Sequence, residues 1–281
     1  VGAGVQMLLE ILCVLLKGRR TVSFPDGSFV QGSTVFAAHG YTVRTRYKDA
    51  DIIYVSPSHM NRQGDVMPIQ RRLELCAHSA DTGAVVIEDD FENDFLYSST
   101  PTPSLYALGS GNVVYMGAFS ALLLPGIRIS FMVLSPALAA AYHQMKDTFA
   151  QTASKTEQIA LCAYLRDGNM KSRTKKIRRL YTGKAKTLCA LLAKALPDHP
   201  VRVGENGLQV QIETPMLPDS APFEQAGLAL YIVKEKSGKN IVVVSPSAVP
   251  ADRLEEAAHA VAAALYKAEE AAKAKKSKDI Y

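Results

Sequence analysis

The sequence predicts an α/β protein in which a large, mostly parallel sheet is followed by a smaller α+β domain. Three observations lead to this prediction. Strands alternate with helices from residue 1 to about 134, a helical stretch follows to about 196, and short strands then precede one long amphipathic helix. The chain has 281 residues, of which 48% are hydrophobic and 21% charged, which is typical of a globular protein with a substantial core.

In the first part, short apolar runs indicate strands, and the segments between them have helical periodicity. A helix is expected to begin at Gly2–Gln6 and to end at Lys17-Gly18, because a basic residue followed by glycine commonly stops a helix. Further strands are predicted at 21–24, 41–47, 51–56 and 84–88, and further helices before Gly40 and at 68–79. In the helix at 68–79, Ile69, Leu73 and Cys76 are expected on the apolar face.

The second part begins with helices and ends with a small sheet. Residues 136–196 have a helical pattern that is interrupted near 167–169, and Leu188, Leu191 and Leu192 are expected on its apolar face. Strands are predicted at 201–203, 208–213, 228–233 and 240–244, followed by a helix at 251–268. The Lys-rich residues 273–281 are expected to be frayed.

Neither a metal site nor a membrane span is predicted. The four cysteines (Cys13, Cys76, Cys162, Cys189) lack CxxC spacing and lie in apolar surroundings, so we expect reduced core cysteines. The histidines lack the HxxxH spacing of a metal site. Gln6 and Glu10 interrupt the apolar run at the N-terminus, and Pro125 and Arg128 interrupt the apolar run at 122–141, so neither run is expected to span a membrane. We therefore expect a cytoplasmic protein. Its net charge of +5 is too mild to indicate nucleic-acid binding by itself.

One stretch, residues 112–130, carries a family resemblance. Val113–Met116 predicts a buried strand, and the chain then passes Phe119-Ser120-Ala121 and Pro125-Gly126 before it reaches Arg128. This order resembles the cofactor-lysine segment of fold-type I pyridoxal-phosphate (PLP) enzymes, in the version found in MocR-type transcription regulators. In that family a Schiff-base lysine precedes the phosphate-binding arginine by seven residues, and Ala121 precedes Arg128 by the same number. The lysine itself is replaced by Ala121.

Two segments near the N-terminus extend the resemblance, which covers nearly the whole chain and implies a fold-type I aminotransferase-like fold. Gly4-Val5-Gln6 resembles the family's phosphate loop, where backbone N–H groups at a helix start attract an anion. By itself, a glycine at that place is more simply a helix cap. Phe29 matches the aromatic residue that stacks on the pyridine ring, and the alternative is an ordinary residue packed in the core.

Two more segments follow strands. Ser56–His59, with Gly64 and Met67-Pro68, resembles the family's Thr-Pro-Ser-His loop, which would bring Asn61 near the cofactor hydroxyl. Ile87–Phe91 resembles the family's Ile-Glu-Asp-Asp-Tyr strand end, whose first aspartate, Asp89 here, pairs with the pyridine nitrogen. The family's tyrosine is Phe91, so its contact with the phenolic oxygen is lost. A solvated acidic loop is the alternative interpretation.

Ser120 and Arg128 match phosphate contacts of the family, and a planar guanidinium suits a phosphate dianion. Ala118 replaces a further hydroxyl donor. The alternative for Arg128 is a surface charge without a ligand. The basic stretch 167–181 resembles the family's inter-domain helix, where the charges are structural, and DNA binding is the alternative reading.

The resemblance implies a large PLP-type α/β domain at 1–150, an inter-domain helix at 151–184 and a small C-terminal domain at 185–281. Several departures from the family argue against transamination. Alanine at position 121 can act neither as nucleophile nor as proton shuttle. The strand at Asn240–Val244 lacks the family's arginine for a substrate carboxylate. We therefore expect a catalytically degenerate domain with no catalytic residue, although an engineered Lys→Ala exchange would explain position 121 alone.

Three functional hypotheses remain at this point. The first is the effector-sensing and dimerisation domain of a MocR-type regulator, with PLP bound non-covalently, weakly or not at all. The second is a PLP-dependent class I/II aminotransferase seen in a lysine-less form, and the third is a structural partner-binding domain that has lost the cofactor. The resemblance also implies a homodimer, a small-molecule effector, and DNA contact only through a domain that these residues do not include.

Overall fold

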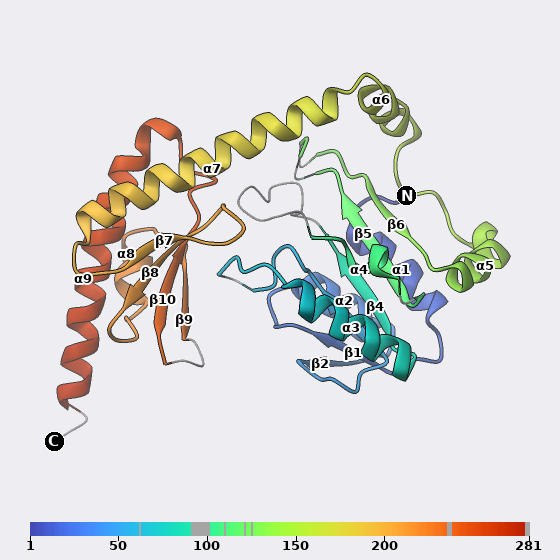
Figure 1. The fold of residues 1–281 in the computed structure, drawn as a ribbon, viewed down its shortest axis with the longest axis horizontal. Helices are drawn as coiled ribbons and strands as arrows, with labels where there is room; N and C mark the ends of the chain where they lie inside the picture. Colours follow the sequence, from blue (N-terminus) through green and yellow to red (C-terminus); the bar gives the residue numbers. More distant parts are fainter. Residues whose placement is uncertain are drawn as a thin grey trace. The chain divides into compact units, whose positions relative to one another are not determined.

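The computed structural model describes residues 1–61, 63–90, 102–109, 111–120, 122–124, 126–234 and 238–278. The described residues divide into two compact units (Figure 1). The first unit contains residues 1–61 and the described residues of 66–175, and the second contains residues 63–65 and the described residues of 176–278. The division after Lys175 falls within one continuous helix, α7.

The first unit is built on a six-stranded sheet with the strand order β2-β1-β3-β4-β5-β6. The first five strands in this order run parallel, and β6 is antiparallel to β5. The strands are β1 (Thr21–Phe24), β2 (Thr42–Thr45), β3 (Ile52–Val55), β4 (Val85–Asp89), β5 (Val113–Ala118) and β6 (Ser130–Val133). The helices are α1 (Val5–Leu15), α2 (Val30–Ala38), α3 (Ile69–Thr82), α4 (Leu105–Leu108), α5 (Pro136–Met145), η2 (Lys146–Thr148) and α6 (Lys155–Arg166).

Alternation along the central strands gives this sheet a core on each face. Ile52 and Tyr54 of β3 join a buried cluster with the apolar residues of α1 and α2. Ile53 and Val55 face the other way, into a cluster with residues of α3 and α4 such as Cys76. Successive side chains of a strand point to opposite faces, so a strand buried on both sides reads as a continuous apolar run.

The second unit is an antiparallel sheet packed against helices. Its strands, in the order β7-β8-β10-β9, are β7 (Val201–Val203), β8 (Val210–Thr214), β10 (Asn240–Val244) and β9 (Tyr231–Lys234). The helical elements are the C-terminal part of α7 (Asn169–Ala195), α8 (Ala221–Gln225), η3 (Ala251–Arg253) and α9 (Leu254–Lys278). Leu188 and Leu192 of α7, Val242 of β10, and Val261 and Leu265 of α9 are among the buried residues of its core.

The predicted fold class is confirmed, and three local expectations are wrong. In α3, Ile69 and Leu73 are exposed (44% and 45%), whereas Arg72 is buried because two backbone carbonyls accept hydrogen bonds from its guanidinium. Cys162 is exposed on α6 and is therefore not a core cysteine. The last helix continues to Lys278, well beyond the predicted end at 268.

In the part of the chain that the structure describes, no helix is both long enough and apolar enough to cross a bilayer. The same residues contain no cluster of His, Cys, Asp and Glu suited to a metal ion.

Candidate functional site

The predicted site residues gather at one edge of the first sheet. The parallel strands β1, β3, β4 and β5 all end at this edge, and β6 begins there because Ala118 pairs with Ser130. Gly2 also pairs with Ser130 through two backbone hydrogen bonds of 2.9 Å, which brings the start of α1 to the same edge. Loops at the carboxyl ends of parallel strands are the usual ligand sites of open α/β sheets.

Arg128 lies against the first turn of α1. Gly4 is the N-cap of this helix, with a φ of 94°, and a Cβ atom added there would lie 2.4 Å from Nη2 of Arg128. Gly4 has no side chain to cap the helix, so the first N–H groups, beginning with those of Val5 and Gln6, have no partner from a cap side chain. A guanidinium beside a helix N-terminus combines two positive features, and both favour a phosphate group.

Asp89 lies at the end of β4 and is buried, with 6% of its surface exposed. The hydroxyl of Tyr54, on the neighbouring strand β3, donates a hydrogen bond to Oδ2 of Asp89. Phe29, the residue before α2, lies beside Tyr54 with the ring centroids 5.3 Å apart and the rings tilted by 32°. Asp89 therefore lies on the same side of the sheet as the aromatic pair of Phe29 and Tyr54. Because its side chain is buried, Asp89 is not part of a solvated loop.

Asp90 follows β4 and accepts hydrogen bonds from the loop after β3 and from β5. Its Oδ1 accepts a hydrogen bond of 2.6 Å from Oγ of Ser58, in the loop after β3. Its Oδ2 accepts one of 2.8 Å from the hydroxyl of Tyr115, on β5. The two bonds hold the loop after β3 at a fixed place relative to the ends of β4 and β5.

Glu88 is fully buried on the other face of β4, where it fixes the start of α4. Its two carboxylate oxygens accept hydrogen bonds from the backbone N–H groups of Leu105 (2.9 Å) and Tyr106 (3.0 Å). Burial raises the pKa of Glu88, and these hydrogen bonds oppose the shift. Burial lowers the pKa of Arg72, while the charges of Glu88 and Asp90 oppose that change. We regard this group as support for the strand end rather than as a ligand site.

The remaining predicted residues are placed less completely. Ser120 is half-buried just after β5, where the N–H of Phe119 donates to the carbonyl of Ile129 (3.0 Å). Ser120 and Arg128 are the chain neighbours of these two bonded residues. Asn61 is half-buried within the loop between β3 and α3. Phe91 and Ala121 lie outside the described residues, so the predictions about them stay predictions.

Two residues at this edge, Tyr54 and Tyr115, were not assigned to the site from the sequence. Tyr54 and Tyr115 could have been noticed, because a tyrosine inside an aliphatic strand needs a partner for its hydroxyl group when it is buried. Ser58 lies in the segment Ser56–His59 that resembles the family's Thr-Pro-Ser-His loop, but the resemblance assigned it no role.

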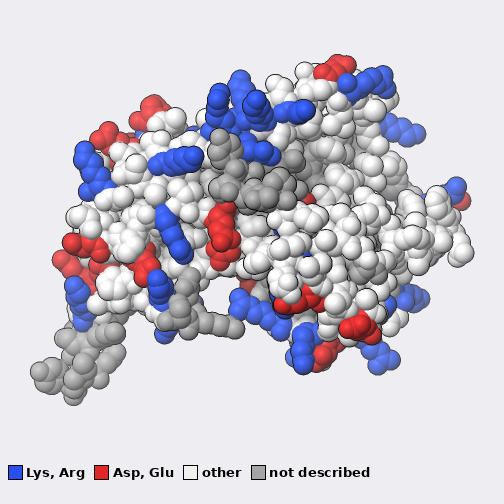
Figure 2. All heavy atoms as spheres, viewed as in Figure 1, with Lys and Arg blue, Asp and Glu red and all other residues white. Residues whose placement is uncertain are grey.

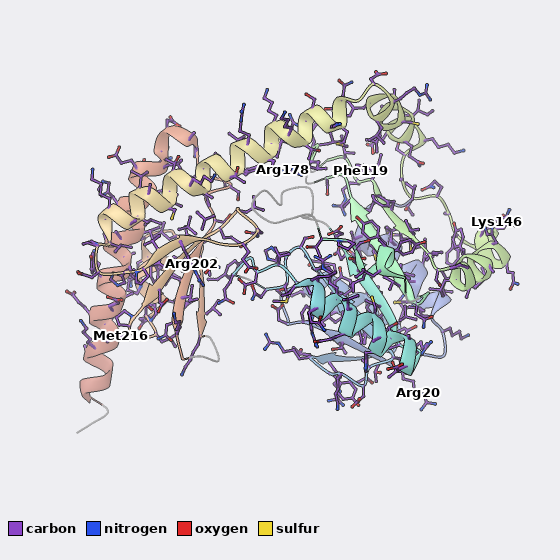
Figure 3. All side chains as sticks on the ribbon, viewed as in Figure 1. Arg20, Phe119, Lys146, Arg178, Arg202 and Met216 are labelled. Atoms are coloured by element: carbon purple, nitrogen blue, oxygen red, sulfur yellow. The ribbon has the colours of Figure 1, made fainter. Side chains whose placement is uncertain are left out.

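In the second unit, the segment 63–65 is bound to the sheet. Nε2 of Gln211 donates to the carbonyl of Gln63 (2.7 Å), and the N–H of Asn206 donates to the carbonyl of Gly64 (2.9 Å). The four described strands of this sheet contain one arginine, Arg202 on β7, and its Nε donates to Oε1 of Gln211 at 2.8 Å (Figure 3). The strand β10, where the family's carboxylate-binding arginine was expected, is uncharged.

The basic stretch forms part of α7. Figure 2 shows Lys and Arg side chains gathered along this helix, and Lys171, Lys175, Lys176 and Arg179 are exposed. Ile177, Thr182 and Ala185 occupy the buried side of the same helix. Such an arrangement is typical of a solvated face opposite a packed one.

Comparison with known proteins gives the family. Residues 1–253 match the family described as aminotransferase class I and II. The chain belongs to this family. The aminotransferase fold is also found in solved structures that cover nearly the whole chain. α-Aminoadipate aminotransferase LysN from Thermus thermophilus has a TM-score of 0.76 at 22% identity, and the match covers 96% of this chain and 77% of that one. Aro8 from Candida albicans has a TM-score of 0.78 at 15% identity, with 95% and 72% covered.

Curated relatives of the chain include proteins named as regulators. The uncharacterized HTH-type transcriptional regulator YdeL of Bacillus subtilis is 29% identical over 261 residues, which are 88% of this chain and 54% of that protein. YhdI from the same organism is 33% identical over 225 residues, 75% of this chain and 48% of that protein. The 2-aminoadipate transaminase of Thermus thermophilus is 28% identical over 186 residues, 65% and 45% respectively. The chain thus spans about half the length of these relatives.

The chemistry of the site fits a pyridine phosphate. Gly4 leaves room for the guanidinium of Arg128 at a helix start, which is an anion-binding arrangement. Asp89 provides a buried carboxylate for a ring nitrogen that carries a proton, and Phe29 provides an aromatic face.

Proposed function

We propose that this chain is the effector-sensing and dimerisation domain of a MocR-type transcription regulator and that it binds PLP, or a related pyridine phosphate, without a covalent bond. The observation that carries the proposal is the combination of Arg128 against Gly4 with the buried Asp89 at the same sheet edge. The similarity to proteins named as HTH-type transcriptional regulators supports the assignment to a regulator. A regulator's DNA contact would then lie in residues other than these, since the aligned region is about half of each relative.

In this proposal each residue has a distinct task. Arg128, Ser120 and the N–H groups at the start of α1 hold the phosphate group. Asp89 accepts a hydrogen bond from the protonated pyridine nitrogen, and Phe29 covers one face of the ring. Bound PLP supplies a ring that withdraws electrons from an attached carbon. With alanine at position 121 the chain lacks the amine that would attach it, so the expected role is recognition and not turnover.

The test is a calorimetric titration of the purified chain with PLP, repeated with Arg128→Ala and with Arg19→Ala as a matched arginine at the opposite end of the sheet. We expect saturable binding that Arg128→Ala weakens by about tenfold or more, as for a charge-assisted hydrogen-bond donor, and that Arg19→Ala leaves unchanged. Binding to the native state should also raise the melting temperature. A titration without heat and without a shift in melting temperature would contradict the cofactor part.

A second experiment distinguishes sensing from catalysis. The variant Ala121→Lys restores the amine, and the visible absorption of a PLP–lysine adduct can be followed directly. Turnover of an amino acid by this variant would favour a disabled aminotransferase, a reading that the similarity to 2-aminoadipate transaminase supports. An adduct without turnover agrees with a sensor domain, because restoring the amine does not restore substrate recognition.

A further inference from the structure

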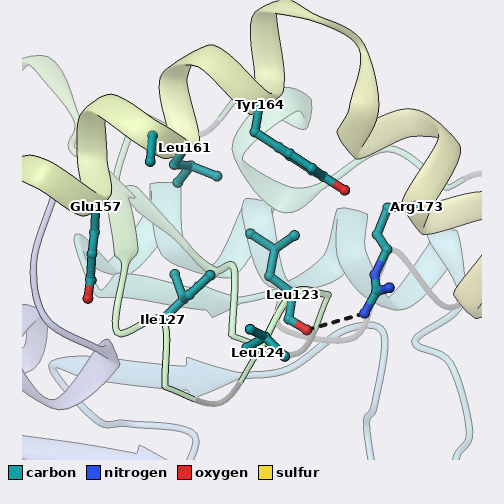
Figure 4. A pocket seen from close by; sticks show the side chains of 8 residues that line it. Leu123, Leu124, Ile127, Glu157, Leu161, Tyr164 and Arg173 are labelled. Carbon is teal, nitrogen blue, oxygen red and sulfur yellow. Dashed lines mark hydrogen bonds between the residues drawn. The ribbon is translucent and has the colours of Figure 1, made fainter.

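A groove of about 400 Å³ lies in the first unit, between α6 and the loop that joins β5 to β6 (Figure 4). None of its lining residues is among those assigned to the cofactor site, although three of them belong to the loop between Ser120 and Arg128. Its walls are mainly apolar, and cavities of this size and character are common small-molecule sites. The lining residues are Leu123, Leu124 and Ile127 from the loop, Glu157, Ala160, Leu161 and Tyr164 from α6, and Arg173 from α7.

The apolar part of the groove has a firm base. Leu161 is buried in a cluster with Ile129, and Leu123 and Ile127 pack against that cluster. Leu124, in contrast, is 60% exposed at the surface of the groove. An apolar ligand would therefore contact the packed side chains of Leu161 and Ile127 and would cover the exposed side chain of Leu124.

The charged groups of the groove lie at opposite ends. Figure 4 shows the Tyr164 hydroxyl directed toward Arg173 at one end, with Glu157 at the other. The guanidinium of Arg173 donates to the carbonyls of Leu122 (3.3 Å) and Leu123 (3.4 Å). Both acceptors are neutral, and both distances are longer than the usual range for such bonds. A carboxylate could bind this guanidinium through shorter, charge-assisted bonds.

We propose that the groove binds an amphipathic monocarboxylate. The carboxylate contacts Arg173 and the Tyr164 hydroxyl, and the apolar body lies along Leu123, Ile127 and Leu161. Glu157 sets the direction of binding, because its charge repels a carboxylate placed at that end. The proposal does not depend on the cofactor site, although the occupant contacts the loop between Ser120 and Arg128.

The test uses octanoate and 1-octanol as probes, titrated into the full chain at neutral pH and followed by calorimetry. Both probes offer the same apolar tail, and one of them carries the charge. We expect octanoate to saturate a single site and to bind at least tenfold more tightly than octanol. Arg173→Gln should remove this preference, whereas Arg166→Gln, which changes an exposed arginine of α6 outside the groove, should preserve it.

A second variant keeps the test decisive if Arg173→Gln does not fold. Ala160 is exposed and lines the groove, so Ala160→Phe should fold and should fill it, with loss of both probes. Equal binding of octanoate and octanol by the unaltered chain would overturn the carboxylate assignment. Absence of octanoate binding, together with a dimer that Ala160→Phe disrupts in sedimentation, would overturn the proposal and would assign this face to a second copy of the chain.

Discussion

The hydroxyl of Tyr54 donates to Oδ2 of Asp89 across the neighbouring strands β3 and β4, and both side chains are buried. Burial raises the pKa of Tyr54 well above its ordinary value, and the adjacent carboxylate raises it further. The phenol therefore stays protonated and remains a donor throughout the physiological range. One oxygen of Asp89 is thus held by the protein, which fixes the direction of a carboxylate that the proposed function requires.

Removing this donor should cost stability. Tyr54→Phe keeps the ring contact with Phe29 and deletes the hydrogen bond to a carboxylate, and such bonds contribute about 1.5–3 kcal/mol. Tyr41→Phe is a matched control, because the buried Tyr41 donates to a neutral acceptor, the carbonyl of Cys13 at 2.9 Å, and should cost about 0.5–1.5 kcal/mol. Urea unfolding measures both values. Equal losses of unfolding free energy would mean that the hydrogen bond to Asp89 contributes no more than one to a neutral acceptor.

The close approach of Arg128 to Gly4 leads to a prediction about anion binding. Gly4→Ala introduces a Cβ that would lie 2.4 Å from the guanidinium, so Arg128 must move and affinity for PLP or inorganic phosphate should fall about tenfold or more. Gly18→Ala is the control, since Gly18 also has a positive φ (107°) but has no atom within 4 Å of its added Cβ. Both variants carry backbone strain, and only the first should lose anion affinity in calorimetry.

Asp51 gives the stability a defined dependence on pH. Its Oδ2 accepts hydrogen bonds from the N–H of Arg20 (2.8 Å) and from the N–H and hydroxyl of Thr21 (2.9 Å each). The Arg20 bond is the largest cause that lowers the pKa of Asp51 below its ordinary value of 3.8. The folded state therefore binds this proton less readily than the unfolded state. The resulting stability is present above pH 3.8 and is lost as the pH falls through the lowered pKa.

The variant Asp51→Asn should remove this contribution. Its unfolding free energy should be lower than that of the unaltered chain at pH 7 and should change less between about pH 5 and pH 2. Asp49→Asn, at an exposed neighbouring position, should retain the steeper loss in acid. Urea unfolding at a series of pH values provides the measurement, and parallel curves for all three proteins would refute the assignment to Asp51.

Much of the fold could be predicted because local pattern and tertiary packing agree. The buried strands β3, β4 and β5 are continuous apolar runs, and the acidic residues that end β4 mark where it meets the ligand edge. The prediction failed in α3, where Leu73 was expected to be buried and Arg72 is buried in its place. Periodicity ranks residues by hydrophobicity, and it cannot register backbone carbonyls such as those of Met67 and Pro103 that satisfy a buried guanidinium.

The candidate site could be predicted residue by residue only where the family resemblance reached. The resemblance assigned both Arg128 and the helix start at Gly4 to a phosphate group. Their contact depends on the pairing of Gly2 with Ser130, which joins residues far apart in the chain. The Tyr54–Asp89 bond likewise depends on the register of β3 beside β4. Strand register is a property of the assembled sheet, and single-strand patterns do not contain it.

The last prediction concerns Gly64, which has a φ of 80° in the segment bound to the second sheet. A Cβ atom there would lie 2.0 Å from Oε1 of Gln209 and 2.6 Å from Oδ1 of Asn206, both of which are buried. Gly64→Ala should therefore combine backbone strain of about 1–2 kcal/mol with an overpacking cost of about 1–3 kcal/mol. Gly40→Ala, at a φ of 83° with no atom within 4 Å of the added Cβ, carries the strain alone. Urea unfolding should thus show a larger loss for Gly64→Ala. Equal losses of unfolding free energy in the two variants would mean that the side-chain amides of Gln209 and Asn206 move away from the added Cβ at little cost. The hydrogen bonds from Gln211 and Asn206 would then not hold this segment in a fixed position.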